Sequence, residues 1–344
     1  MASSPLHRHQ SLLENAPYFS PDLFLDTELR GHASHKLYSI CEHFDTGRPH
    51  RDFSRPRLIR YTYTYSLSQE SRDYFLRAFF QAVDLRIDGN EHINFEAIRS
   101  KFFDFGDYLF NNFFLPVKAC TRMTPQPSQA PHFAVQEAQS QDEVRLLALQ
   151  RDCLIRDRHR CVISRRFDCA KAMERRNAPN GAQDDEGNLL ENDPDDPEFL
   201  EVAHILPHLL TRVHRGEPGH PRKYMLAILN MLDVGVAELI QSSEIDRSRN
   251  ALTLTAHYHR SFRDFQVYFE QVPDKDHIYT IKTFYPEYLV RRAAFPITRE
   301  LYLTPDRNIE PPSRRLLALH CAIAHILPSP TPSRATPLAK TAKN

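Results

Sequence analysis

The chain of 344 residues is long enough for one large domain or two smaller ones, and its 41% hydrophobic and 26% charged residues are typical of a globular protein. Its 44 Lys and Arg residues balance its 44 Asp and Glu residues, so the overall charge gives no argument for a nucleic-acid partner. The nine glycines form no G-x-G pair, and none precedes Lys-Ser or Lys-Thr, which excludes a dinucleotide-binding fingerprint and a P-loop.

The six cysteines are scattered and form no C-x-x-C pair, which excludes a zinc knuckle and a small disulfide-rich scaffold. The first twenty residues lack the apolar core of a signal peptide, and no stretch approaches the ~18 apolar residues of a membrane span. We therefore expect an intracellular protein, of the cytoplasm or nucleus, with no membrane partner.

The N-terminal part is predicted to be helical over residues 21–118, after a disordered segment over residues 1–20. Ser66 and Gln69 resemble a capping box that opens a helix running to about Leu85. A second helix is predicted from about Ile93 to Phe114. Both carry a stripe of phenylalanines at helical spacing, which favours a packed core over a ligand pocket.

A proline-rich linker is predicted over residues 119–141, and a helix is expected to resume at about Asp142. Its expected buried positions are Val144, Leu147, Leu154 and Ile155. Residues 151–176 carry more basic than acidic side chains. These basic side chains either contact phosphates or form the solvated face of a helix. Within this stretch, Cys161 to Ser164 is predicted as a short strand.

The acidic run over residues 181–201 holds nine acidic and no basic side chains, and is predicted to be a solvated loop. A strand is expected over residues 200–205 and a helix over 221–241. Residues 265–272 and 277–284 alternate with period two, which predicts a hairpin. The C-terminal segment, residues 286–327, should contain a helix from Pro312, followed by a disordered tail over residues 328–344.

The 18 histidines are the strongest chemical signal. His204 and His208 have the spacing of a zinc-binding helix, but Pro207 breaks that helix and no glutamate follows His204. His320 and His325 are five residues apart on the predicted C-terminal helix, so we expect them on different faces, at the surface.

A longer pattern is more informative. His204 stands at the end of a predicted strand, Asn250 follows after an insertion, and His259 lies in a segment predicted as a helix over residues 250–262. On that helix His259 would share an inward face with apolar neighbours. Such a histidine is usually a hydrogen-bonded core residue, but the ordered set of His, Asn and His favours a site.

This set resembles the HNH nuclease family, whose ββα-metal unit presents His, Asn and His from a hairpin and a helix. Residues 160–164 and the segments YLFNNFFLPVKA and RRLLALHCAIAHIL resemble the fungal branch of that family. The resemblance implies an α+β fold with a helical N-terminal module, an HNH-like domain over residues 142–285 with a further β-hairpin, and a C-terminal helix.

The resemblance also implies roles for these residues. His204 and Asn250 would be the catalytic residues: His204 would be the general base, and Asn250 would fix the loop that orients it. His259 would bind a divalent metal ion (Mg, Mn or Zn). A helix N-cap is the simpler structural role for Asn250, and it is compatible with the first. The family often has an acidic ligand immediately before the base, where this sequence has Ala203.

The missing acidic ligand has three candidates, Glu201, Asp168 and His208. Alternation along the strand puts Glu201 on the same side as Ala203, which makes it the first choice as a metal ligand. Two functions follow from these patterns: a metal-dependent endonuclease that acts on DNA, or a non-catalytic nucleic-acid-binding or scaffold protein that keeps a degenerate HNH fold.

Overall fold

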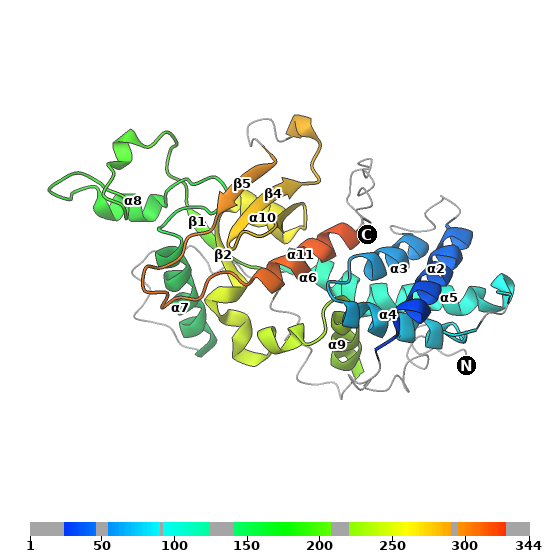
Figure 1. Cartoon of the computed structure of the whole chain (residues 1–344). Helices are drawn as coiled ribbons and strands as arrows, with labels where there is room; N and C mark the ends of the chain where they lie inside the picture. The colour runs from blue at the N-terminus through cyan, green and yellow to red at the C-terminus, as the bar shows by residue number, and fades with distance from the viewer. Residues whose placement is uncertain are drawn as a thin grey trace.

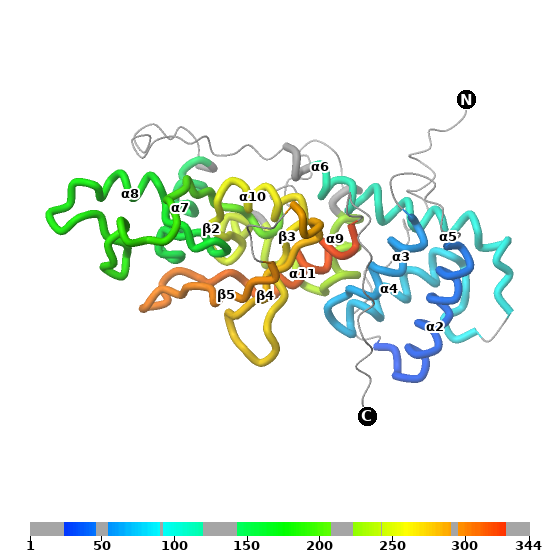
Figure 2. The backbone as a smooth tube through the Cα atoms, turned by 90° about the horizontal axis from the view of Figure 1, so that it is seen from above, coloured from blue at the N-terminus to red at the C-terminus, as the bar shows by residue number. Residues whose placement is uncertain are grey.

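The computed structural model of the chain describes residues 24–45, 54–89, 92–123, 141–207, 220–289 and 295–327. It combines many helices with two small antiparallel sheets, which confirms the predicted α+β class. The molecule is elongated, with the N-terminal helices at one end and α8 at the other (Figures 1 and 2). The segments 1–20 and 328–344, predicted to be disordered, lie outside the described residues.

The N-terminal helices begin where a side-chain oxygen accepts a hydrogen bond from an N–H of the first turn. Asp26, Ser54, Ser68 and Asn94 each do so. The helices are α2 (Thr27–Phe44), α3 (Arg55–Thr64), α4 (Gln69–Ala82), α5 (Phe95–Leu109) and α6 (Leu115–Met123), with a π-helical turn, η2 (Phe110–Phe114), between the last two.

The phenylalanine stripes of α4 and α5 form a packed core, as the sequence predicts. Phe79 of α4 and Phe105 of α5 are buried, with ring centroids 5.5 Å apart and planes at 74°, the edge-to-face arrangement that aromatic pairs favour. The predicted cap was two residues too early, since Ser68 and not Ser66 caps α4. Ser66 instead donates to the carbonyl of Met231 in α9 (His220–Leu232), at 2.7 Å.

The C-terminal two thirds contain the sheets. The helices are α7 (Gln141–Arg156), α8 (Cys169–Arg175), α9, α10 (Ala256–Arg263) and α11 (Arg314–Ile326). Strands β1 (Leu200–His204) and β2 (Ala251–Thr255) form one antiparallel pair. Strands β3 (Val267–Gln271), β4 (Ile278–Thr283) and β5 (Ile297–Glu300) form a meander, whose first two strands are the predicted hairpin.

The β1–β2 pair has a helix against each face. Its register places Glu201 opposite Leu254 and His204 opposite Ala251. On one face Val202 and Ala251 pack against Leu149 and Cys153 of α7. α10 packs on the same two strands and follows β2 without a loop.

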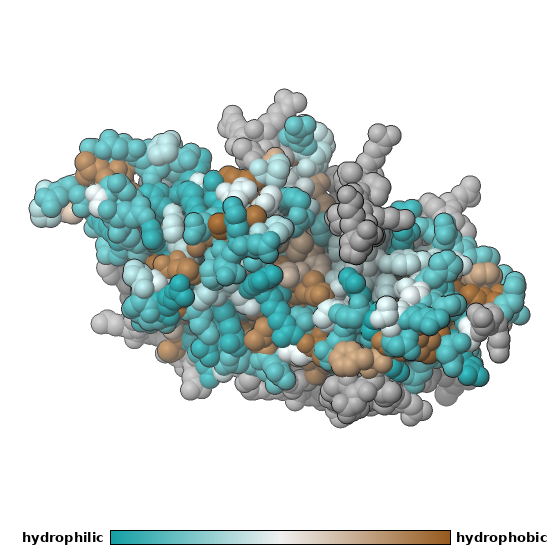
Figure 3. Space-filling model, in the orientation of Figure 1, coloured by the Kyte–Doolittle hydropathy of each residue, from teal (hydrophilic) through white to brown (hydrophobic). Residues whose placement is uncertain are grey.

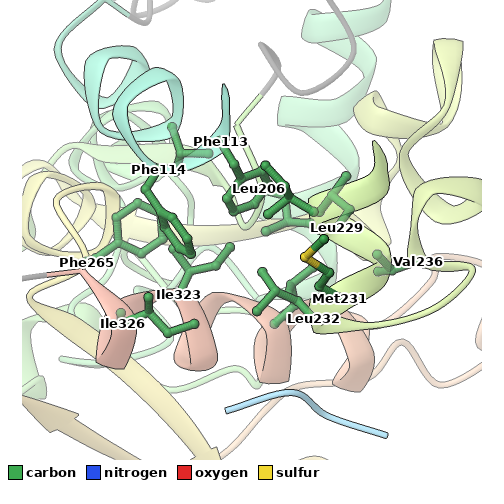
Figure 4. Close-up of a cluster of buried hydrophobic side chains, with 14 of the residues drawn as sticks. Phe113, Phe114, Leu206, Leu229, Met231, Leu232, Val236, Phe265, Ile323 and Ile326 are labelled. Carbon is green, nitrogen blue, oxygen red and sulfur yellow. The ribbon is translucent and has the colours of Figure 1, made fainter. Parts of the chain in front are cut away.

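A continuous apolar core joins the N-terminal helices to the rest of the molecule. Figure 4 shows Phe113 and Phe114 of η2 beside Phe265, with Ile323 of α11 and Leu229 of α9 in the same cluster. All five side chains are buried. The helical module and the sheet-containing part therefore share buried surface.

Two predictions of local structure were wrong. Residues 251–255 form a strand, because Leu252 and Leu254 alternate with threonines, and alternation of period two suits a sheet. Cys161–Ser164 forms turns between the bridge partners Arg160 and Phe167, although the run is largely buried. Short apolar runs of this kind do not distinguish a strand from a buried turn.

Two predictions of burial were also wrong. On α7, Val144 and Ile155 are 53% and 47% exposed, so the buried face is turned relative to the prediction. His320 is not at the surface: it is 1% exposed, its Nε2 lies 3.1 Å from the carbonyl oxygen of Phe262, and its ring stacks on that residue at 3.9 Å.

Candidate active site

The junction of β2 and α10 aims the second histidine of the motif. The Thr255 hydroxyl accepts a hydrogen bond from the Tyr258 amide at 3.4 Å and so caps α10. Thr255 is therefore the N-cap that the sequence suggested for Asn250. Because no loop separates strand from helix, the direction of β2 fixes the first turns of α10, and with them the position of His259.

Glu201 and His259 meet between β1 and α10. The His259 Nδ1 lies 2.7 Å from the Glu201 Oε2, and the two side chains are only 13% and 14% exposed. Burial is the main cause that lowers the pKa of His259; Arg263 and His204 act in the same direction, while Glu201 opposes them. A neutral imidazole with a carboxylate beside it is a suitable pair of donors for a divalent cation.

His204 ends β1 and pairs with an acid that the sequence did not point to. Its Nε2 lies 3.1 Å from Oδ1 of Asp246, the last residue of the turn η7 (Ser242–Asp246), and the side chains are 14% and 8% exposed. Since a carboxylate accepts, the pair is read with Nε2–H donating, which puts the lone pair of the ring on Nδ1. This arrangement suits a proton acceptor held in one orientation.

Asn250 is completely buried and links the two segments that carry His204 and Asp246. Its Oδ1 accepts from the Leu206 amide at 3.0 Å, and its Nδ2 donates to the carbonyls of Leu206 at 3.2 Å and Ile245 at 2.9 Å. Leu206 lies two residues after His204, and Ile245 lies immediately before Asp246. The amide of Asn250 therefore holds both members of the pair in register.

A buried ion pair supports the same segment from the side of α7. Arg156 and Asp157 have fully buried side chains joined by two hydrogen bonds of 2.8 and 2.9 Å. Arg156 also donates to the carbonyls of Ser248 at 2.7 Å and Ala251 at 2.9 Å, on either side of Asn250. Asp157 accepts from the Thr253 amide at 3.1 Å. The ion pair fixes the backbone that enters β2.

The other candidates for the missing metal ligand have different positions. Asp168 caps α8, where Oδ1 accepts from the Lys171 amide at 2.8 Å, and its Oδ2 accepts from the Leu200 amide at 3.2 Å. Both of its oxygens thus accept from backbone amides, one at the start of α8 and one at the start of β1. Ala203 is buried, and His208 lies outside the described residues.

The basic surplus and the acidic run, which were predicted separately, neutralise each other in the lobe around α8. Figure 3 shows mainly hydrophilic side chains over this lobe. Four arginines pair with carboxylates of the acidic run: Arg158 with Glu186, Arg160 with Asp184 and Asp193, Arg166 with Asp195 and Glu198, and Arg175 with Asp185. These arginines are therefore tied within the lobe and do not form an unpaired basic face.

The structure thus forms two pairs along β1, His204 with Asp246 and Glu201 with His259, and Asn250 holds the first pair in place. His204 is near enough to His259 to help lower the pKa of that imidazole. Sequence reasoning missed Asp246 and the pair of Arg156 and Asp157. Asp246 lies in a loop with no periodicity, and its only sequence signal is its closeness to Asn250. The adjacent charges of the ion pair looked like part of a solvated helix face.

Comparison with known proteins agrees with this arrangement over part of the chain. Residues 161–270 match the family model of an HNH endonuclease. The match covers all four predicted site residues as well as Asp246, and it supports an HNH nuclease domain in this region. Such domains generally cleave DNA, so the match implies a nucleic-acid substrate.

Two further comparisons gave no relatives: no curated protein and no solved structure matches the chain. In the part of the chain that the structure describes, no helix has the length and apolar character needed to cross a membrane.

Proposed function

We propose that the chain is a metal-dependent endonuclease that hydrolyses phosphodiester bonds in DNA. The proposal rests mainly on one observation: the pairs His204–Asp246 and Glu201–His259, formed by β1, α10 and the turn η7, lie within the residues that the HNH match covers. The further resemblance to the fungal branch of the family stays a prediction, because the match is to HNH endonucleases in general.

His204 would act as the general base. The attacking water would give its proton to Nδ1 as the oxygen approaches phosphorus, and the ring would become positively charged. Asp246, bonded to Nε2–H, would stabilise that charge and keep the ring from turning. Asn250 would be a positioning residue, since its amide bonds to backbone on both sides of the pair.

Glu201 and His259 are the proposed ligands of the divalent ion. Their donor set of one carboxylate oxygen and one imidazole nitrogen fits Mg²⁺, Mn²⁺ or Zn²⁺ when water and phosphate oxygens complete the coordination. Bound there, the ion would supply charge stabilisation to the phosphate and the leaving oxygen. Because the protein supplies only two ligands, and only one of them is charged, we expect a modest affinity for the ion.

The test is cleavage of supercoiled plasmid by the purified full chain with Mg²⁺, Mn²⁺ or Zn²⁺, and with EDTA. We expect cleavage that EDTA stops and that His204→Ala lowers roughly 10²–10⁴-fold, the usual contribution of a general base. His257→Ala is the matched control, since His257 is exposed on the same helix as His259. Equal rates for parent and His204→Ala would overturn the proposed role of His204.

One observation favours the second function, a non-catalytic nucleic-acid-binding or scaffold protein. Glu201 and His259 are already in direct hydrogen-bond contact at 2.7 Å, and this contact can join β1 to α10 without an ion. Under that function the folded protein would bind DNA or a partner protein, would cleave nothing with any of the three metals, and would show no heat of Mn²⁺ binding in calorimetry.

A further inference from the structure

A second cluster of metal-binding side chains lies away from the proposed active site, between β3 and α11. Glu270 of β3 and Cys321 and His325 of α11 place one oxygen, one sulfur and one nitrogen within 4.8 Å of one another. In the part of the chain that the structure describes, this is the one group of three such side chains placed closely enough to hold a metal ion. Cys321 and His325 are four residues apart, so they share one face of α11.

We propose that Glu270, Cys321 and His325 form a zinc site that fastens α11 to the β3–β4–β5 sheet. A thiolate and an imidazole are ligands that Zn²⁺ prefers, while Mg²⁺ and Mn²⁺ favour oxygen. The three side chains are partly exposed, which leaves room for a water molecule as the fourth ligand. This site is separate from Glu201 and His259, and it does not depend on the proposed nuclease activity.

Distances within the cluster support an ion between its members. His325 Nε2 and Glu270 Oε1 lie 3.9 Å apart, which is too long for a hydrogen bond. Two ligand atoms on a tetrahedral zinc are separated by roughly 3.4 Å, so a small side-chain adjustment would let both bind one ion. The other oxygen of Glu270 pairs with Lys282 of β4, so Oε1 can face the ion while Oε2 keeps that pair.

The surroundings hold the ligands in place. The ring of Tyr65, immediately after α3, stacks on His325 with centroids 4.7 Å apart and planes at 6°, and the rings of Tyr268 and Phe284 meet it edge-on. An imidazole fixed by three rings loses little conformational freedom on binding. Because Tyr65 belongs to the N-terminal helical part, the site lies where that part, α11 and β3 meet.

Metal binding would require the thiol to lose its proton. Burial, with the nearby Glu270, raises the pKa of Cys321 to about 12, so the group is a thiol at neutral pH without an ion. Coordination replaces the S–H bond by a sulfur–metal bond and releases one proton to the buffer. The competing arrangement is a simple set of charge contacts among Lys282, Glu270 and His325, which needs no ion.

The test uses the full chain and Co²⁺ as a spectroscopic substitute for zinc. We expect a cobalt–thiolate charge-transfer band that Zn²⁺ abolishes by displacement. Cys321→Ser should remove the band, and His325→Gln should weaken Co²⁺ binding roughly tenfold or more. Cys169→Ser, which changes another partly buried free cysteine, should leave the band unchanged. Glu201→Ala should leave it unchanged too, which separates this site from the proposed active site.

A second measurement needs no substitution. In the unmodified chain, Zn²⁺ should slow the alkylation of Cys321 relative to Cys169, as followed by mass spectrometry of peptides. No charge-transfer band in the parent protein, an undiminished band in folded Cys321→Ser, or alkylation of Cys321 at an unchanged rate would each overturn the zinc site and leave the charge contacts as the explanation.

Discussion

His204 and Asp246 are 42 residues apart in the sequence, yet the ring nitrogen Nε2 of the first lies 3.1 Å from a carboxylate oxygen of the second. They are joined through Asn250, whose side chain bonds to the backbone beside each of them. The relationship gives the proposed general base a fixed orientation and a neighbouring negative charge, and it can be tested at each of the three residues.

Asp246→Asn should slow DNA cleavage while leaving DNA binding intact. The amide keeps the size of the carboxylate but removes the charge that would stabilise a protonated His204, and it allows the ring to adopt the other tautomer. We expect a loss of roughly 10²–10⁴-fold in the single-turnover rate. Asp264→Asn, an exposed carboxylate at the end of α10, is the control and should cleave like the parent.

Glu201→Ala should lower Mn²⁺ affinity and cleavage together, because it removes the charged ligand and leaves one neutral imidazole. Isothermal calorimetry with Mn²⁺ measures the first and plasmid cleavage the second. The same change breaks the hydrogen bond to His259, so we also expect a loss of about 1 kcal/mol in the free energy of unfolding. Unchanged Mn²⁺ affinity in folded Glu201→Ala would remove Glu201 from the site.

Asn250→Ala should destabilise the protein by about 2–4 kcal/mol, since it leaves one backbone amide and two carbonyls without partners in a buried position. Urea unfolding gives the value. Asn188→Ala, at an exposed position where the side chain makes one 3.2 Å bond to Asp184, is the comparison and should cost less. Similar losses in the two variants would contradict the linking role of Asn250.

The order of His204, Asn250 and His259 was visible in the sequence because each belongs to a short sequence motif. The side of β1 that carries Glu201 was also predictable, since alternation along a strand is strict. The strand over residues 251–255 was missed in favour of a helix, although the alternation of leucine and threonine there has period two. Local pattern therefore singled out the residues that we propose for the site, but it did not give the strand that precedes His259.

Contacts between distant loops could not be predicted. Asp246 lies in an irregular segment, and its place beside His204 depends on the bonds that Asn250 makes in the folded chain. Similarly, Arg156 and Asp157 are charged, and charged residues are rarely buried without a partner. Their burial follows from mutual pairing and from backbone acceptors 92 and 95 residues away, which no local pattern contains.

Arg156→Met should cost about 3–5 kcal/mol of the free energy of unfolding, because it leaves the Asp157 charge buried without its partner. The double variant Arg156→Met/Asp157→Asn should lose less than the sum of the two single variants, since no unpaired charge then remains. Urea unfolding of all four proteins completes the cycle. Strict additivity would contradict a direct, buried interaction between these two side chains.

Asp73 provides a test of pH dependence in the helical N-terminal part. Burial by itself would raise the pKa of its carboxyl, but hydrogen bonds from Arg30 and from the Leu25 amide lower the pKa below its usual value. The unfolded chain, with a carboxyl pKa of about 3.9, therefore binds the proton first as the pH falls. The stability that this group contributes is present above that pH and is lost as the pH falls through the lowered, folded-state pKa.

Asp73→Asn should consequently be less stable than the parent at pH 7, by about 2 kcal/mol, and the difference should shrink as the pH is lowered below about 4. Thermal unfolding between pH 7 and pH 3 measures both quantities. Asp276→Asn, at an exposed carboxylate in the turn between β3 and β4, controls for the general loss of negative charge. A stability difference between Asp73→Asn and the parent that stays constant over this range would show that the charge of Asp73 contributes nothing, because only an ionised carboxylate with a lowered pKa makes the difference depend on pH.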